Sequence, residues 1–366
     1  MENYHPLIGT DIADLDTPTL LVDIDMLERN FQLIADTYRD TECKMRAHIK
    51  NLKSPMLAHM QIRAGGTVGG VCAAKVSEAE AMVDGGIDDI LIPNQVVTAD
   101  KIERLCSLAR QAKMMVAADN TDNLQAISDA ASAMGVSVGV VIEVDTQMER
   151  AGIRATEQGV VLAKFADSLP GIDFKGVMSH QTLPGQPDRE TRFIEGPRFI
   201  QKTLDVKEAI EAEGIAVEVV SAGESWTYDI CPTIPGVTEV EGGTYALMSH
   251  AYAYMDEFEF AGKILGTVTS TPRPGVAIGD TGSRCLASPS GVLPEIVGVE
   301  GVRVDSLGPN HIVLKSEGEM PLDIGDKFQL ISGQQDIMVN RWDQFIGVRD
   351  GKVEAVWDIT ARGCHN

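Results

Sequence analysis

An alternation of short apolar segments with amphipathic segments across residues 17–255 constrains the fold of this chain most strongly. Residues 113–118 (KMMVAA) and 137–144 (SVGVVIEV) read as buried strands, and 121–134 between them has helical spacing of its apolar residues. Eight strands alternating with helices predict a (β/α)8 TIM-like barrel rather than an open sheet. The predicted strands are 43–49, 67–72, 89–92, 113–118, 137–144, 173–178, 216–220 and 237–241. The predicted helices are 25–38, 55–64, 76–84, 99–110, 121–134, 156–167, 190–213 and 244–255.

The pattern changes near residue 256. Short strand-like segments then follow one another, with Gly, Pro and Asp turns and no long helix between them. VRDGKVEAVW at 348–357 carries the Asp-Gly signal of a tight β-hairpin. The sequence therefore predicts an N-terminal segment of residues 1–16, a barrel of residues 17–255 and an all-β C-terminal domain of residues 256–366.

The charge balance excludes several classes of partner. Asp and Glu number 54 against 31 Lys and Arg, a net charge of -23, and such a surface repels phosphate backbones of nucleic acids. No apolar run reaches the length of about 18 residues that a membrane span needs, and the first 16 residues lack the pattern of a signal peptide. Six cysteines without CxxC spacing indicate free buried thiols. We therefore expect a cytoplasmic protein with no nucleic-acid or membrane partner.

The most informative segment for chemistry is KMRAHIKNLKSP at 44–55. Residues two apart on a strand share a face, so Arg46, His48 and Lys50 are expected to point into the barrel near its C-terminal end. Nearby cations favour the neutral form of a lysine amine, which can then attack a carbonyl group. The segment predicts a Schiff-base lysine, and a solvated basic strand end is the alternative.

Two further segments follow predicted strands. SAGESWTY at 221–228 forms a small-residue turn whose backbone N–H groups and hydroxyls could hold a phosphate, although such loops occur in many barrels. EVDTQMERAG at 143–152 ends a strand with Glu143 and Asp145 and places Arg150 five residues later. A structural ion pair is the alternative reading of that segment.

Taken together, these segments resemble the D-threonine aldolase and eukaryotic-type D-serine dehydratase family, which comprises pyridoxal phosphate enzymes of the alanine racemase fold. The resemblance covers nearly the whole chain. It rests on TPTLLVDIDMLERN (17–30), RAHIKNLKSP (46–55), AAKVSEAEAMVDGGIDDILIPN (73–94), VIEVDTQMERAGI (141–153), VSAGESWTY (220–228), TEVEGGTYALM (238–248) and VRDGKVEAVWDITARG (348–363).

The resemblance implies a role for each matching position. Lys50 would bind pyridoxal 5'-phosphate as a Schiff base and act as acid and base at Cα of the substrate. His48 would lie beside the cofactor as a further catalytic residue, and Arg150 would contact its phenolic oxygen. The remaining cofactor-binding residues implied are Ser221, Gly223, Ser225, Tyr228 and Tyr245. Glu224, inside the phosphate loop, would repel a phosphate and is expected to point outward.

Two departures from the family pattern bear on the reaction. The family's lyases carry a His-x-Asp or His-x-Cys metal pair, whereas SGQQDIMVN at 332–340 has Gln334 at the histidine position and keeps Asp336. Amide and carboxylate oxygens suit Mg²⁺ or Mn²⁺ better than Zn²⁺, and they bind these ions weakly. The sequence is therefore compatible both with a bound ion and with no ion at this position. In GVMSHQTLPGQ at 176–186, His180 replaces a usual tyrosine, with Gln181 beside it, and we predict a catalytic role for His180.

The resemblance implies a lyase acting on a β-hydroxy-D-amino acid, with retro-aldol cleavage to glycine and an aldehyde as the first choice. Elimination of water, as in D-serine or D-3-hydroxyaspartate dehydratases, is the alternative. A racemase would need a second acid/base that we do not identify, and a non-catalytic pyridoxal phosphate carrier would lack the β domain. A cofactor-free Schiff-base aldolase is the remaining class. The family also implies a homodimer in which each β domain closes the partner's barrel.

Overall fold

The computed structural model describes residues 4–288 and 291–366, which form two compact units. The barrel unit consists of Gln32–Lys50, Pro55–Gly243 and Cys364–Asn366. The sheet unit gathers the N-terminal residues through Phe31, Asn51–Ser54 and Thr244–Gly363. The sequence predicts contiguous parts, whereas these compact units are interleaved along the chain.

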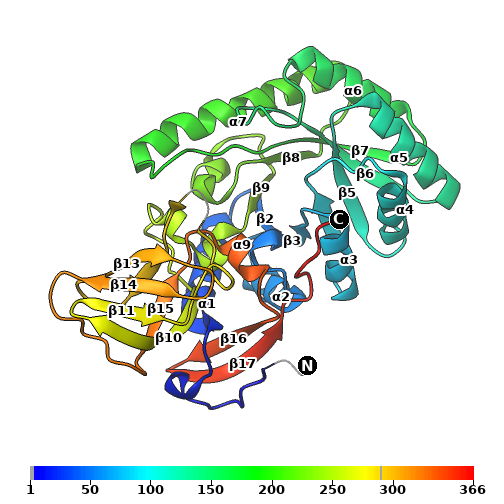
Figure 1. Ribbon diagram of the computed structural model, residues 1–366. Coiled ribbons are helices and arrows are strands. Elements are labelled where there is room, and N and C mark those ends of the chain that lie inside the picture. Colours follow the sequence, from blue (N-terminus) through cyan, green and yellow to red (C-terminus); the bar gives the residue numbers. More distant parts are fainter. Residues whose placement is uncertain (1–3, 289–290) are drawn as a thin grey trace. The chain divides into compact units, whose positions relative to one another are not determined.

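The barrel unit is a closed barrel of eight neighbouring parallel strands, with helices around it (Figure 1). This confirms the predicted (β/α)8 barrel. Its strands are β2 (Lys44–His48), β3 (Thr67–Cys72), β4 (Asp89–Ile92), β5 (Lys113–Ala118), β6 (Val138–Glu143), β7 (Ile172–Ser179), β8 (Val219–Ala222) and β9 (Glu239–Gly242). Its helices are α2 (Pro55–Ala64), α3 (Val76–Asp84), α4 (Ala99–Leu108), α5 (Thr121–Met134), α6 (Thr156–Ser168) and α7 (Arg189–Ala212).

The interior of the barrel contains an apolar layer and a charged layer. The apolar layer is a cluster of buried side chains from successive strands, namely Cys72, Leu91, Met115, Ala117, Val141 and Met178. The charged layer centres on Arg46 of β2, which forms ion pairs with Glu239 of β9 and Asp89 of β4. Because side chains fill this interior, a ligand has room only at the strand ends, as in other barrels of this type.

The sheet unit is built on a nine-stranded sheet with the order β13-β14-β11-β10-β1-β16-β17, while β15 pairs with β10 and β12 pairs with β15. This confirms the predicted all-β character of the C-terminal part. The strands are β1 (Thr19–Asp23), β10 (Gly262–Arg273), β11 (Val276–Gly279), β12 (Glu295–Val297), β13 (Val302–Leu307), β14 (Ile312–Ser316), β15 (Lys327–Ile331), β16 (Gln344–Arg349) and β17 (Lys352–Asp358).

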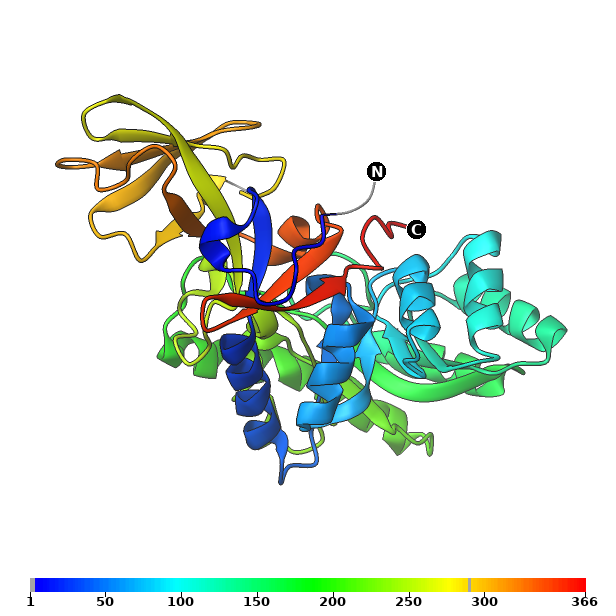
Figure 2. The same ribbon diagram turned by 90° about the horizontal axis from the view of Figure 1, so that it is seen from below.

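Two elements differ from the sequence prediction. The sequence predicts that residues 19–23 belong to the barrel domain, 17–255. In the structure they form β1, which pairs with β10 and β16 of the sheet unit, and Figure 2 shows the blue β1 beside the red hairpin. An apolar strand pattern predicts burial but does not specify which sheet the strand joins. The helix predicted at 244–255 is only α8 (Thr244–Leu247), because Met248 adopts a positive φ of 60° that ends the helix.

Helix α1 (Ile24–Tyr38) connects the two units along the chain. No helix in the described part of the chain is both long and apolar enough to span a membrane. None of the six cysteines forms a disulfide bond, as the sequence predicts, and five of them are buried, whereas Cys364 is partly exposed.

Candidate active site

A cavity of about 240 Å³ opens at the C-terminal ends of the barrel strands, and we call it the Lys50 cavity. Its lining residues lie at the ends of β2, β3, β4, β6, β7 and β9 or in the loops that follow them. They are His48, Lys50, Ala74, Lys75, Pro93, Asn94, Arg150, Met178, His180 and Glu241. The structure thus brings together four predicted site residues from three distant segments: His48, Lys50, Arg150 and His180.

Lys50 follows β2 and belongs to a short 3-10 helix, Ile49–Asn51. Its backbone N–H donates to His48 Nδ1 at 3.5 Å. The sequence placed Arg46 on the same face as these two residues, and this prediction is only partly right. The strand ends at His48, so Lys50 turns into the cavity, whereas the Arg46 guanidinium is buried below in the charged layer. Carboxylates of the barrel, rather than a ligand, neutralise Arg46.

Arg150 and His180 reach the cavity from the segments after β6 and at the end of β7. The Arg150 side chain is half exposed, with a guanidinium nitrogen 3.6 Å from buried Glu143, whose other oxygen accepts a hydrogen bond from Gln95. Burial, together with the charges of Lys50 and Arg150, lowers the pKa of His180 to about 3. The His180 imidazole is therefore neutral at physiological pH and has a ring nitrogen able to accept a hydrogen bond.

The predicted phosphate loop begins within β8, which contains Ser221, and continues after the strand. Gly223 has a φ of 97°, and a Cβ there would lie 2.3 Å from Thr227 Oγ1, so only glycine fits this turn. Ser225 Oγ accepts a hydrogen bond from the Gly243 N–H at 3.1 Å, and Ser221 Oγ donates to Glu241 at 2.8 Å. The carbonyl of Tyr228 accepts a hydrogen bond from the Tyr38 hydroxyl at 2.7 Å.

The loop is therefore well ordered by internal contacts, but its four predicted residues do not line the Lys50 cavity. Ser221 connects the two sites through its bond to Glu241, which does line the cavity. The expectation that Glu224 points outward is wrong, because this side chain is buried, with 7% of its surface exposed. Thr227 Oγ1 accepts the Glu224 N–H at 3.0 Å, which holds that residue inside the turn.

Tyr245 lies on α8 in the sheet unit and is completely buried. Its ring packs against Phe258 at a centroid distance of 5.7 Å. Its hydroxyl has no hydrogen-bond partner within the described residues, and burial raises the pKa of this phenol. A buried hydroxyl without a partner is costly, so this atom is suited to a polar group of a ligand.

The predicted metal residues lie at the start of α9 (Gln335–Val339) in the sheet unit. Gln334 precedes the helix, and Asp336 Oδ1 accepts a hydrogen bond from the Ile337 N–H at 2.8 Å. Across residues 4–288 and 291–366, no group of three or more His, Cys, Asp or Glu side chains is arranged to hold a metal ion. Gln334 and Asp336 therefore supply one amide oxygen and one carboxylate, and neither is a histidine.

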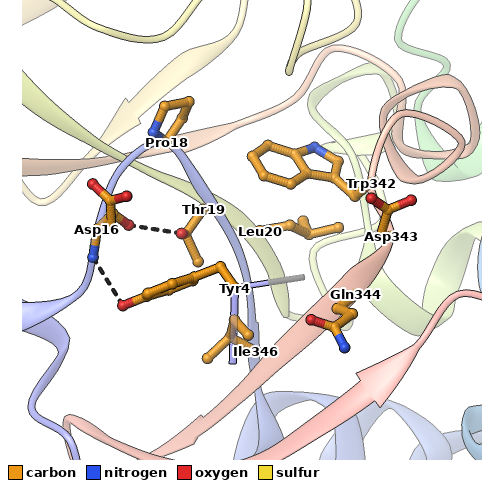
Figure 3. Close-up of a pocket in the computed structure, with 9 residues that line it drawn as sticks. All are labelled: Tyr4, Asp16, Pro18, Thr19, Leu20, Trp342, Asp343, Gln344 and Ile346. Atoms are coloured by element: carbon orange, nitrogen blue, oxygen red, sulfur yellow. Dashed lines mark hydrogen bonds between the residues drawn. The ribbon is translucent and has the colours of Figure 1, made fainter. Parts of the chain in front are cut away.

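A second cavity, of about 200 Å³, lies within the sheet unit (Figure 3). The Tyr4 hydroxyl accepts a hydrogen bond from the Asp16 N–H at 3.1 Å, and Thr19 Oγ1 donates to the Asp16 carbonyl at 2.7 Å. None of the nine residues drawn there is basic or was predicted as a site residue. This cavity therefore offers no group for the chemistry expected at Lys50.

Sequence reasoning missed three polar residues of the Lys50 cavity: Lys75, Asn94 and Glu241. The signal for Glu241 was present, because Glu239 and Glu241 alternate along a strand that is otherwise apolar and buried. Two acidic residues that face the interior of a barrel each need a cation or a ligand as partner, so both could have been predicted as candidates for ion pairing or ligand binding.

Comparison with known proteins first defines the class. The model of the alanine racemase N-terminal domain matches residues 22–250, and that of a putative serine dehydratase domain matches residues 261–348. The 3-hydroxy-D-aspartate aldolase of Paracoccus denitrificans (strain Pd 1222) is 34% identical over 98% of this chain and 95% of its own. The D-threonine aldolase of Arthrobacter sp. is 32% identical over 97% and 95%.

Among solved structures, D-threonine aldolase from Filomicrobium marinum has a TM-score of 0.94 and 33% identity, covering 99% of this chain and 100% of that one. The fold is thus that of the alanine racemase class, as predicted. Within this class, the chain belongs to the family that includes D-threonine aldolase and 3-hydroxy-D-aspartate aldolase. Dehydratase relatives are more distant: the D-threo-3-hydroxyaspartate dehydratase of Delftia sp. (strain HT23) is 28% identical over 64% of this chain.

Proposed function

We propose that this chain is a pyridoxal phosphate-dependent lyase that cleaves a β-hydroxy-D-amino acid into glycine and an aldehyde. The observation that carries the proposal is the Lys50 cavity, where Lys50 lies with His48, Arg150 and His180 at the mouth of the barrel. The full-length relatives named as aldolases support the choice of reaction.

The described residues fit the proposed cofactor. Lys50 supplies an amine for its aldehyde, and Arg150 a cation for an anionic oxygen. The glycine turn at Gly223 fits the close approach of a phosphate to the backbone after β8. Tyr245 is added to these residues on the family resemblance alone. We propose these four, with Ser221, Ser225 and Tyr228, as the cofactor-binding residues.

When bound, the pyridine ring of this cofactor takes up the electrons left as a bond to Cα breaks. The chain's own residues must then move two protons. We propose that His180, whose lowered pKa keeps the imidazole neutral, accepts the proton of the β-hydroxyl as Cα–Cβ breaks. Lys50 delivers the proton that Cα needs to become glycine, and Arg150, anchored near Glu143, orients the cofactor.

Elimination of water is the second candidate, because Lys50 is also placed to remove a proton from Cα. It differs in the fate of the β-hydroxyl, which leaves instead of losing its proton. The aldolase relatives match nearly all of this chain and the dehydratase of Delftia only part of it, which favours the aldolase.

A divalent cation, Mg²⁺ or Mn²⁺, stays a prediction based on Gln334 and Asp336. Their donor set does not fit a firmly held ion, because an amide and one carboxylate leave most of an octahedral shell to water. We therefore assign no step of the reaction to a metal.

We also propose a homodimer located in the cytoplasm. The family resemblance supports the dimer, and the free thiols of all six cysteines are compatible with a reducing compartment. Light scattering of the purified protein would test the dimer, for which a mass of one chain is the contradicting result.

The decisive experiment is product identification with a panel of β-hydroxy-D-amino acids, including D-threonine and 3-hydroxy-D-aspartate, with and without a chelator. Glycine and an aldehyde are the expected products, and the rate is expected to persist in chelator. Ammonia and a keto acid would replace the aldolase with the dehydratase. No cofactor absorbance in the purified protein, even after incubation with pyridoxal phosphate, would contradict both.

A further inference from the structure

Among the residues that line the Lys50 cavity, Glu241 carries the one carboxyl group. Its side chain is on β9, is 5% exposed, and has its Oε1 held by a hydrogen bond from Ser221 Oγ at 2.8 Å. The other ionisable groups of the cavity are basic, namely Lys50, Lys75, Arg150, His48 and His180. The Ser221 hydrogen bond fixes the orientation of this carboxyl group, which is the one acidic group among basic ones in the cavity lining.

The charged layer beneath the cavity explains why Glu241 is not already paired with a cation. Glu239 and Glu241 are two apart on β9 and therefore face the same side. Arg46, the nearby cation, donates from Nη2 to Glu239 at 2.9 Å and from Nη1 to Asp89 at 2.5 Å. Burial raises the pKa of Glu241 to about 7, and the charge of Glu239 adds to this rise. Hydrogen bonds with Ser221 and Cys72 and the charge of Arg46 oppose it. The cavity thus contains a carboxyl group that can hold or release a proton near neutrality.

The charges of the cofactor can be matched with those of the cavity. Pyridoxal phosphate has an anionic phosphate, an anionic phenolic oxygen and one basic ring nitrogen. The Gly223 turn suits the phosphate and Arg150 the phenolic oxygen, as proposed above, whereas a protonated ring nitrogen requires an acceptor that carries negative charge. The amide of Asn94 is neutral, and its Nδ2 donates to the Ala74 carbonyl at 3.0 Å. Among the residues that line the cavity, Glu241 is the one that can accept a hydrogen bond from the ring nitrogen with a negative charge.

We propose that Glu241 pairs with the ring nitrogen of the cofactor and gives it a proton, an inference that rests on the proposed function. The O–H bond of the carboxyl group breaks and an N–H bond forms on the ring, which leaves a carboxylate beside a cationic ring. No other reactant is needed. The ring is then a stronger electron acceptor at the moment when the bond to Cα breaks. Ser221 is a positioning residue, because its hydroxyl holds the Glu241 carboxylate in place.

The test uses the holoenzyme reconstituted with cofactor labelled with ¹⁵N in the ring, observed by NMR at neutral pH. The wild-type ring nitrogen is expected to have the shift of a protonated pyridine. In Glu241→Gln, which keeps the size of the side chain, we expect the shift of an unprotonated pyridine. The cofactor is expected to bind about 10-fold more weakly in this variant, the effect of losing one hydrogen bond to a charged group.

Glu80→Gln is the control, since it neutralises a glutamate of the same barrel that pairs with Arg104 and belongs neither to the Lys50 cavity nor to the charged layer. Its ring nitrogen is expected to stay protonated. An unprotonated ring in the wild-type holoenzyme, or identical shifts in wild type and Glu241→Gln, would overturn the proposal. The wild-type spectrum decides even if the variant fails to fold. Failure of the proposed function shows in other measurements: the products would be ammonia and a keto acid, or the wild-type protein would not bind the cofactor at all.

Discussion

The Lys50 cavity and the charged layer beneath it are two regions of one barrel, built partly from the same strands, β2 and β9. In the charged layer, Arg46 is bonded to Glu239 and Asp89, and its charge is offset. At the mouth, Lys50 lies with Lys75, Arg150, His48 and His180 around a single carboxyl group. The comparison teaches that matched charges mark the structural layer, and that an excess of basic groups marks the place for an anionic ligand.

The largest effect is expected from Lys50→Ala. This change removes the amine that holds the cofactor, so turnover should fall by about a thousandfold or more. Borohydride reduction followed by peptide mapping should find the cofactor on Lys50 in the wild type and on no lysine in the variant. A reducible link to another lysine would show that Lys50 is not the lysine that forms the Schiff base with the cofactor.

Arg46→Gln should cost about 3–5 kcal/mol of unfolding free energy, because it leaves buried Glu239 without its cation. Denaturant unfolding measures this loss. The double variant Arg46→Gln/Glu239→Gln should recover part of it, since both members of the buried pair are then neutral. Equal stability of the wild type and the single variant would show that the ion pairs of the charged layer do not stabilise the barrel, contrary to the structural role given to that layer above.

His180→Gln should change how stability depends on pH. The pKa of His180 is about 3 in the folded protein and near 6.5 when unfolded, so the unfolded chain takes up a proton that the folded one does not. The wild type therefore loses stability as the pH falls from 6.5 towards 3. Without cofactor, the unfolding free energy of the variant relative to that of the wild type should be about 1–2 kcal/mol higher at pH 5 than at pH 7. Parallel pH curves would show that His180 is exposed to water.

The smallest effect is expected from Arg104→Gln, a control for Arg46. Arg104 forms a two-bond pair with Glu80, of the same kind as Arg46 with Glu239, but each side chain is about one-third exposed. Its loss should change the unfolding free energy by less than about 1 kcal/mol. A loss as large as that of Arg46→Gln would mean that burial does not explain the difference.

Much of the fold could be predicted because its signals are local. All eight barrel strands were placed to within a few residues, since each is a short apolar run between amphipathic helices. The strand β1 was not recognised, because TLLVD shows only that these residues are buried. Pairing with β10 and β16, which follow more than two hundred residues later, is a property of the folded chain.

The site was predicted in part. Lys50, His48, Arg150 and His180 were found from their segments, and the barrel brings them to one cavity. Glu241 was missed because nothing local distinguishes a carboxyl group that lines a cavity from Glu239, which is bound to an arginine. Ser225 was placed correctly after a strand, whereas Ser221 lies within β8. Their hydrogen bonds, to Glu241 from Ser221 and from Gly243 to Ser225, could not be read from the sequence.

The sequence by itself determined the alternation of strands and helices, the all-β C-terminal part and the lysine segment, because periodicity and residue type are local properties. Only the tertiary structure decided that Arg46 is neutralised inside the barrel while Lys50 is left at its mouth. Both residues are basic and lie four positions apart. Their difference depends on which carboxylates other strands bring near them, and barrel closure settles this.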